Sequence, residues 1–250
     1  MPNPILKVLS TLSRHRAAYL LMGGQACVLY GAAEFSRDTD IAVLDDSQNL
    51  DRLSQALDEL QAECVALPPF ERDYLERGHA VHFRCRHPEA LGMRVDIMSM
   101  MRGVAPFAEL WERRTSMEYG SAMRIEVMGL PDLVRSKKTQ RDKDWPMIRR
   151  VLEAHFLQHR DQPNPEQLRF WLRESRTPAM LMELAERFPD QLAAMVPQRP
   201  LLAQARSGDE GAIARGLETE ERQEREADRL YWLPLRRELE QLRHRRRESR

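Results

Sequence analysis

Two aspartates separated by one residue are the first feature of this sequence that could do chemistry. Asp38 and Asp40 lie in residues 38–44, a segment that begins polar and ends apolar, as a strand does where it leaves a core. Side chains two residues apart on a strand project from one face, so the carboxylates can share a site. Paired carboxylates repel unless a cation lies between them, and hard oxygen ligands favour magnesium or manganese. The same pattern also occurs where a polar strand simply enters solvent.

A glycine pair and a third acid strengthen the metal-site reading. Gly23 and Gly24 lie between an apolar segment and a helical one, where the absence of side chains lets backbone N–H groups approach a phosphate. A tight turn is the alternative. Asp96 is the single acid in residues 94–98, a segment that is otherwise apolar apart from Arg94. A charge in such a strand is costly unless it is paired or binds a metal. Asp96 is therefore a candidate third ligand, and an ion pair with a neighbouring arginine is the alternative.

The spacing of apolar residues predicts the elements that position these side chains. Strand-like and helical periods alternate up to about residue 139, and the period is helical after residue 144. We expect strands at 18–22, 38–44, 80–85, 93–99 and 122–127, and helices at 4–15, 25–30, 47–62, 106–113, 130–138, 145–159, 166–174, 178–188, 201–207 and 218–246, the last kinked or interrupted at Pro234. The predicted fold is α/β (α+β), with a mixed β-sheet core. We predict a catalytic domain at 1–143 and a helical region at 144–250.

Composition limits the class of protein. Hydrophobic residues make up 42% of the 250 positions, charged residues 31%, and the formal net charge is zero, so only a local basic patch could bind nucleic acid by charge. The arginine-rich segment 236–250 is such a patch, although a solvated helix end is the simpler account. Glycines interrupt the apolar stretch 17–33, so no membrane association is expected. Three cysteines without paired spacing fit a cytoplasmic protein, and the histidines at 79, 82 and 87 match no zinc pattern.

These motifs together resemble a known superfamily. A Met-Gly-Gly at residues 22–24, thirteen further residues, Asp-Thr-Asp-Ile at 38–41 and a distant Asp96 are similar to the pattern of the polymerase-β-like nucleotidyltransferases. Residues 130–137, which end in lysine, and Arg-Asp-Lys-Asp at 141–144 resemble bacterial nucleotidyltransferases of the abortive-infection toxin type. The resemblance covers roughly residues 15 to 155.

The resemblance implies roles for particular residues. Asp38, Asp40 and Asp96 would bind two metal ions and be catalytic, and Gly23 and Gly24 would hold the triphosphate. Arg37, directly before the first acid, and Lys137 would contact the nucleotide, and Lys137 would also neutralise charge during the reaction. The alternative for Lys137, Lys138 and Lys143 is a solvated helix face.

The sequence departs from the family pattern near the first acid. Many relatives place an arginine and a threonine further ahead of that acid, whereas here Arg37 directly precedes it. A second register would make Asp40 the first acid and place Ala42 where the second belongs, which predicts an inactive site. We prefer Asp38 with Asp40, because Ile41 then continues the strand and all three acids are present.

The predicted function is metal-dependent transfer of a nucleoside monophosphate from a nucleoside triphosphate to an acceptor hydroxyl. The cofactor would be Mg²⁺ or Mn²⁺, and the acceptor would be RNA, a protein or a small molecule. If the chain is the toxin of a toxin–antitoxin pair, an antitoxin would be its partner. One alternative is a catalytically silent nucleotide-binding or interaction protein of the same fold. Another is an unrelated metal-dependent phosphoesterase, which would release phosphate and not pyrophosphate.

Overall fold

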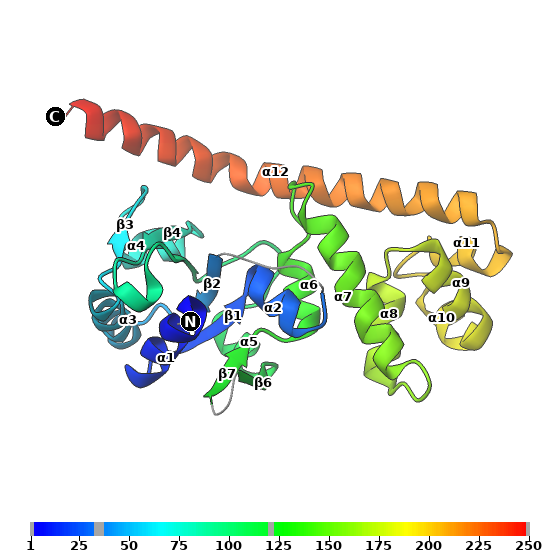
Figure 1. Cartoon of the computed structure of the whole chain (residues 1–250). Helices are drawn as coiled ribbons and strands as arrows, with labels where there is room; N and C mark the ends of the chain where they lie inside the picture. Colours follow the sequence, from blue (N-terminus) through cyan, green and yellow to red (C-terminus); the bar gives the residue numbers. More distant parts are fainter. Residues whose placement is uncertain (1–2, 33–37, 120–122, 249–250) are drawn as a thin grey trace. The chain divides into compact units, whose positions relative to one another are not determined.

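The computed structural model describes residues 3–32, 38–119 and 123–248, and these divide into two compact units (Figure 1). Of these residues, the first unit contains 3–29, 38–119, 123–136 and 231–248, and the second contains 30–32 and 137–230. The first unit contains a mixed β-sheet with helices, and the second is helical. The predicted mixed α/β fold is therefore confirmed.

The sheet of the first unit has seven strands in the order β3-β4-β5-β2-β1-β7-β6. The strands are β1 Tyr19–Met22, β2 Asp38–Val43, β3 Glu63–Cys64, β4 Val81–Arg84, β5 Arg94–Met98, β6 Thr115–Tyr119 and β7 Met123–Val127. The β2–β5 and β1–β7 pairs are parallel, and the other neighbouring pairs are antiparallel. Strand β2 thus lies at the centre of the sheet, between β5 and β1.

The two faces of the central strands differ in polarity because successive side chains alternate. Ile41 of β2 and Val95 and Ile97 of β5 are fully buried and belong to the hydrophobic core. Asp40 and Asp96, one residue away on the same strands, are only partly buried. Burial of the apolar set fixes the register, because a slip of one residue would turn the charged set into the core.

The first unit also contains helices. They are α1 Pro4–Arg14, α2 Gly23–Leu29, α3 Ser47–Glu59, α4 Arg72–Glu76, a short 3₁₀ helix at Pro88–Ala90, α5 Phe107–Glu112 and α6 Leu130–Ser136. Helices α1 and α2 contact strands of the sheet. Helix α1 packs against α3, and α2 packs against α6. The carboxylate of Asp46 caps α3 by accepting from the backbone N–H of Asn49 at 2.7 Å. The sheet therefore positions β1 and β2 next to the beginning of α2.

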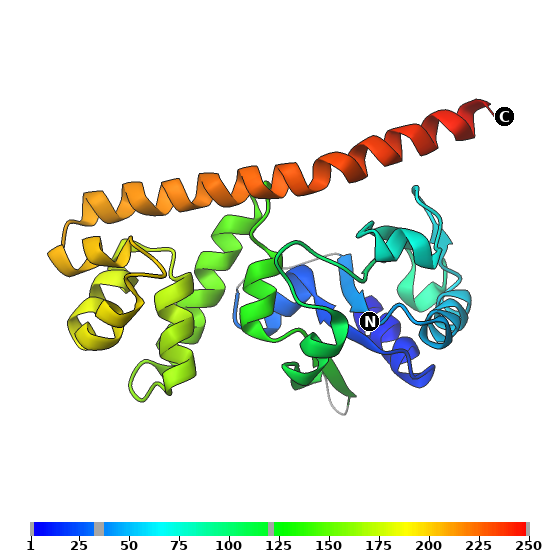
Figure 2. The ribbon, with the colours of Figure 1, turned by 180° about the vertical axis from the view of Figure 1, so that it is seen from behind.

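The second unit is built around two buried tryptophans. Its helices are α7 Asp144–His159, α8 Pro165–Glu174, α9 Pro178–Arg187, α10 Pro189–Met195 and α11 Leu202–Ser207, and the last three contact one another (Figure 2). Trp145 and Trp171 are almost completely buried. The indole N–H of Trp145 donates to the carbonyl of Thr139, and that of Trp171 donates to Nδ1 of His155, both at 2.9 Å. Each buried donor is therefore satisfied.

Helix α12, Glu210–Glu248, contributes residues to both units. It begins eight residues before the predicted helix and continues through Pro234, so of the kink or interruption predicted there the interruption is wrong. Within the second unit, Arg225 of α12 forms an ion pair with Asp142. Within the first, Glu238 lies 2.8 Å from Nε2 of His79. Although α12 is long, it is too charged to cross a bilayer, and the other helices of the described chain do not meet that requirement either.

Some elements were not expected from the sequence. Strand β6, helix α4 and helix α10 lie in segments to which no element was assigned. Each has at most seven residues, so its hydrophobic period is too short to read. Strand β6 forms through its antiparallel pairing with β7, which a local pattern does not reveal.

His155 of α7 is held in its neutral form. An indole N–H can only donate, so Nδ1 of His155 must be the unprotonated acceptor of the bond from Trp171. Burial, followed by the nearby charge of His159, lowers the pKa of His155 from 6.5 to about 4. The unfolded chain therefore takes up this proton first as the pH falls, which removes stability between about pH 6.5 and pH 4.

We predict that His155→Gln weakens this pH dependence. Glutamine keeps an acceptor for Trp171 but does not titrate. The unfolding free energy of the wild type minus that of the variant should therefore fall by about 1 kcal/mol from pH 7.5 to pH 5, a figure reduced for the partial solvent exposure of His155. Urea unfolding of both proteins at the two pH values measures this difference. A constant difference would show that His155 charges equally well in the folded chain.

Candidate active site

Three acids lie on one face at the centre of the sheet. In the parallel pairing of β2 with β5, Asp40 lies opposite Asp96 and Asp38 lies opposite Arg94. Asp38 and Asp40 share a face because they are two residues apart on β2, and both are partly buried. The structure therefore brings the second and third predicted acids onto adjacent strands at the same level, with the first acid next to them.

Asp96 has two cationic or polar partners on this face. Its Oδ1 atom accepts from Nε of Arg94 at 2.8 Å and lies 2.8 Å from Nδ1 of His82 on β4, which is opposite Asp96 in the antiparallel register. Burial alone would raise the pKa of Asp96, but the hydrogen bonds from His82 and Arg94 outweigh it and hold the pKa below its usual value. Asp96 is therefore ionised at neutral pH. The ion pair with a neighbouring arginine, the alternative weighed from the sequence, is present.

Arg94 balances more than one acid. Burial would lower the pKa of its guanidinium, but the charges of Asp96, Asp38 and Asp40 raise it above its ordinary value. Because Arg94 attracts all three carboxylates, it reduces the repulsion between them. Sequence reasoning did not assign Arg94 or His82 to the site. The signal that could have found them is the alternation of β4 and β5, which places both side chains on the acidic face.

Gly23 packs directly against the second acid. It follows β1, whose last residue Met22 is paired with Asp40, and it is the first residue of α2. Its φ is +69°, and a Cβ atom at this position would overlap the carboxylate of Asp40. Glycine is thus required both by backbone conformation and by space. Gly24, the other predicted phosphate-binding glycine, is buried in the first turn of α2.

The pairing register favours one of the two readings of the acidic motif. Ala42, which the alternative register places where the second acid belongs, lies opposite Met98 and is completely buried. Asp40 lies opposite Asp96. A site built on Asp38 and Asp40 therefore adjoins the third acid, whereas a site centred on Ala42 adjoins an apolar side chain.

The carboxylates supply the donor chemistry for a hard divalent cation. Asp38, Asp40 and Asp96 offer only oxygen atoms, the ligands that Mg²⁺ and Mn²⁺ prefer. Among the described residues, no three histidine, cysteine or acidic side chains are gathered in a metal-binding arrangement. In this structure Oδ1 of Asp96 forms an ion pair with Arg94 and contacts His82, so a metal at Asp96 would have to share this carboxylate with protein partners or replace them.

Lys137 belongs to the second unit, where it is buried. Its Nζ atom donates to Oδ1 of Asp144 at 3.1 Å. Oδ2 of Asp144 accepts from Thr139 and from Nε of Arg141 at 2.7 Å. Burial would raise the pKa of Asp144, but these donors, led by the charge of Lys137, lower it. The Arg-Asp-Lys-Asp motif is therefore organised around one buried carboxylate, and Lys137 does not lie on a solvated helix face.

Other residues singled out in the sequence have varied positions. Arg37 lies outside the described residues. Lys138 is largely buried and forms an ion pair with Glu174 at 2.7 Å, whereas Lys143 is exposed. His79 lies 2.8 Å from Glu238, whereas His82 lies 2.8 Å from Asp96.

Comparison with known proteins finds distant structural similarities. No family model and no curated protein matches the chain. Two solved structures from Helicobacter pylori, a provisionally assigned nucleotidyltransferase and the protein JHP933, are each 13% identical to it, with TM-scores of 0.42 and 0.39. Both alignments cover 88% of this chain, and they cover 92% and 93% of the other chains. Because these scores are low, the functional proposal is built on the residues of this chain.

Gly23→Ala should destabilise the fold more than a matched glycine change. Gly103 has the same φ of +69° but no atom within 4 Å of a Cβ placed on it, so Gly103→Ala measures the cost of backbone conformation alone. At Gly23 the added methyl also displaces Asp40, which should cost a further ~1–3 kcal/mol. Urea unfolding of the two variants tests this, and equal losses would mean that Asp40 moves freely away from Gly23.

Asp144→Asn should destabilise the second unit by about 3 kcal/mol, because Lys137 would lose its buried counter-charge. Asp142→Asn is the matched control, since Asp142 is 98% exposed and lies in the same segment. Its ion pair with Arg225 is at the surface, so its loss should cost less than about 1 kcal/mol. Similar losses of unfolding free energy in the two variants would contradict a structural role for the Lys137–Asp144 pair.

Proposed function

We propose that the chain is a metal-dependent nucleotidyltransferase that moves a nucleoside monophosphate from a nucleoside triphosphate to an acceptor hydroxyl. The observation that carries the proposal is the register that places Asp40 opposite Asp96, with Asp38 on the same face. Three acids on adjacent strands supply the negative charge that would hold a metal–triphosphate, and the glycine pair that begins α2 lies beside them.

In this proposal Asp38, Asp40 and Asp96 hold Mg²⁺ or Mn²⁺. A bound divalent cation would neutralise triphosphate oxygens and lower the pKa of the attacking hydroxyl. Asp96 remains ionised at neutral pH, the state required of a ligand or a proton acceptor. His82 and Arg94 orient its carboxylate through contacts of 2.8 Å. They are positioning residues, and each would have to share Asp96 with the metal.

The glycines and two cations complete the proposed nucleotide site. Gly23 and Gly24, which begin α2 beside Asp40, are proposed to hold the triphosphate. Arg37 and Lys137 are proposed to contact the triphosphate or the departing pyrophosphate. Lys137 would exchange part of its interaction with Asp144 for this anion. The acceptor is proposed to be RNA, a protein or a small molecule, and an antitoxin would be the partner if the chain acts as a toxin.

A catalytically silent nucleotide-binding protein is the second candidate. The observation that favours it is that Asp96 already forms an ion pair with Arg94 and contacts His82, as expected of a site that does not need a metal. The two candidates differ in whether label from the nucleotide is transferred. They agree in requiring the acidic face of β2 and β5 for nucleotide binding.

Substitution of the acids should abolish transfer without unfolding the chain. We expect Asp40→Asn and Asp96→Asn to lower label transfer from α-³²P-labelled ATP, CTP, GTP or UTP by roughly 10²-fold or more, with Mg²⁺ or Mn²⁺ present and total RNA and protein as acceptors. Asp51→Asn, an exposed change on α3, is the control and should retain full activity.

The outcomes separate the two candidates. Transfer that survives in Asp40→Asn would show that the acidic face is not the active site. If the wild type transfers no label, calorimetry with the same nucleotides decides between the remaining readings. Binding that Asp40→Asn weakens supports the silent protein, and the absence of binding rejects both.

A further inference from the structure

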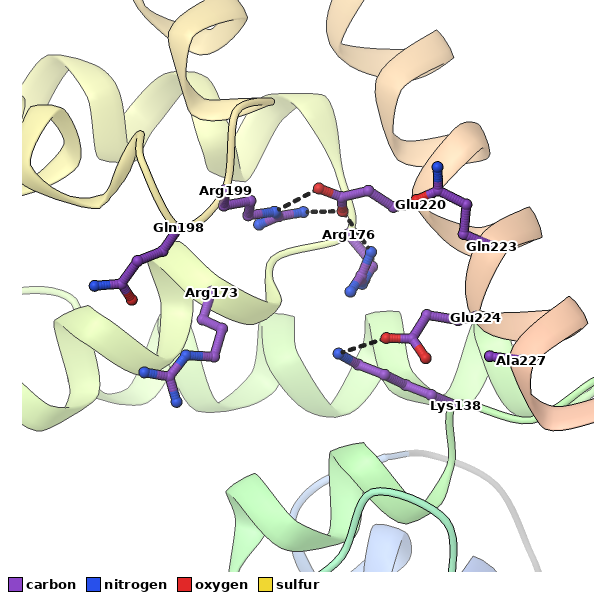
Figure 3. Close-up of a pocket in the computed structure, with 9 residues that line it drawn as sticks. All are labelled: Lys138, Arg173, Arg176, Gln198, Arg199, Glu220, Gln223, Glu224 and Ala227. Atoms are coloured by element: carbon purple, nitrogen blue, oxygen red, sulfur yellow. Dashed lines mark hydrogen bonds and ion pairs between the residues drawn. The ribbon is translucent and has the colours of Figure 1, made fainter. Parts of the chain in front are cut away.

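A polar pocket of about 370 Å³ lies entirely within the helical unit (Figure 3). It is separate in composition from the acidic face, because none of its lining residues comes from the sheet. Its charged lining consists of four cations and two carboxylates, Lys138, Arg173, Arg176, Arg199, Glu220 and Glu224. A pocket of this size is within the range that holds small ligands.

The carboxylates of the pocket are already engaged by cations. Glu220 receives Nε and Nη2 of Arg199 at 3.0 and 2.8 Å, and Nη1 of Arg176 at 2.7 Å. Lys138 lies between Glu224, at 3.6 Å, and the buried Glu174, at 2.7 Å. Four cations therefore face three carboxylates, and the pocket carries an excess of positive charge.

Arg173 supplies that excess. It is exposed on α8, lines the pocket, and makes no hydrogen bond or ion pair with any residue in the described part of the chain. Figure 3 shows its guanidinium on the same side of the pocket as the amide of Gln198, across from the side chains of α12. An unoccupied guanidinium fork beside an amide group is a ready donor set for an oxyanion.

Arg176 provides a second, independent indication. Only 5% of its side chain is exposed, and its Nε–H is buried without a hydrogen-bond acceptor in the described structure. Burial, and then the like charge of Arg199, lowers the pKa of Arg176. A buried guanidinium that is incompletely bonded and next to another is stabilised by additional negative charge nearby.

We propose that this pocket binds the phosphate group of a small phosphorylated ligand. Phosphate fits better than carboxylate because three cations line the pocket from two segments, Arg173 and Arg176 at and just after the end of α8 and Lys138 between α6 and α7. A tetrahedral phosphate offers acceptor oxygens in several directions, whereas a planar carboxylate is satisfied by a single fork. The volume beyond the phosphate accommodates the rest of the ligand. This binding requires no chemistry and is independent of the function proposed for the acidic face.

The test compares two arginines of the same helix. Arg173→Gln removes the unpaired fork, and Arg169→Gln makes the same change one turn earlier, at an exposed position outside the pocket. Titration calorimetry of the full chain with inorganic phosphate, AMP and acetate should show binding of the first two and weaker binding of acetate. We expect Arg173→Gln to weaken phosphate binding about 10-fold or more and Arg169→Gln to change it less than about twofold.

The affinities for phosphate and AMP show how much of the ligand the pocket recognises. If the protein binds phosphate and AMP with equal affinity, it recognises the phosphate alone, whereas tighter binding of AMP indicates that the nucleoside also occupies the pocket. The proposal is overturned if the wild type does not bind phosphate up to tens of millimolar, if acetate binds equally well, or if both variants lose affinity equally. Both arginines are exposed, so equal melting temperatures of the three proteins serve as the folding control.

Discussion

The parallel pairing of β2 with β5 is the constraint on which the candidate active site depends. A single register decides at once which side chains form the core and which acids meet. In this register Ile41 pairs with Ile97 on the buried face of the sheet. The same register pairs Asp40 with Asp96 on the opposite face. The hydrophobic free energy of the first pair therefore holds the second pair together against its electrostatic repulsion.

Arg94 and Gly23 make this repulsion tolerable in different ways. Arg94 places a guanidinium next to Asp96, and its charge is felt by the other two acids. Gly23 gives Asp40 room that any other residue would fill. Neither contributes to the hydrophobic core, and both are explained by the acids they adjoin. Such a concentration of charge on a central strand has a cost in stability, which is typical of positions kept for function.

The sequence located several helices of three or more turns well, although not the start of α12, and did not reveal how the strands pair. Helices α1 and α7 were predicted within one residue of their observed ends, because each carries several turns of amphipathic period. The acids of β2 and β5 were found from their spacing and from the rarity of a charge in an apolar strand. Strand order was not predictable, since the contact between β2 and β5 joins segments more than fifty residues apart. For that reason His82, which reaches the site from β4, was missed.

Two kinds of buried carboxylate in this chain illustrate how a site differs from a structural contact. Asp144 is 1% exposed, and Lys137, Thr139 and Arg141 all donate to it, so its oxygens are satisfied within one short segment. Asp96 is more accessible, and its two side-chain partners in the described structure, His82 and Arg94, both contact Oδ1. A carboxylate that is enclosed and fully bonded stabilises a fold, whereas one that is ionised and accessible retains the capacity to bind a cation from solution. Exposure and the distribution of donors over the two oxygens, more than charge, therefore distinguish Asp96 from Asp144.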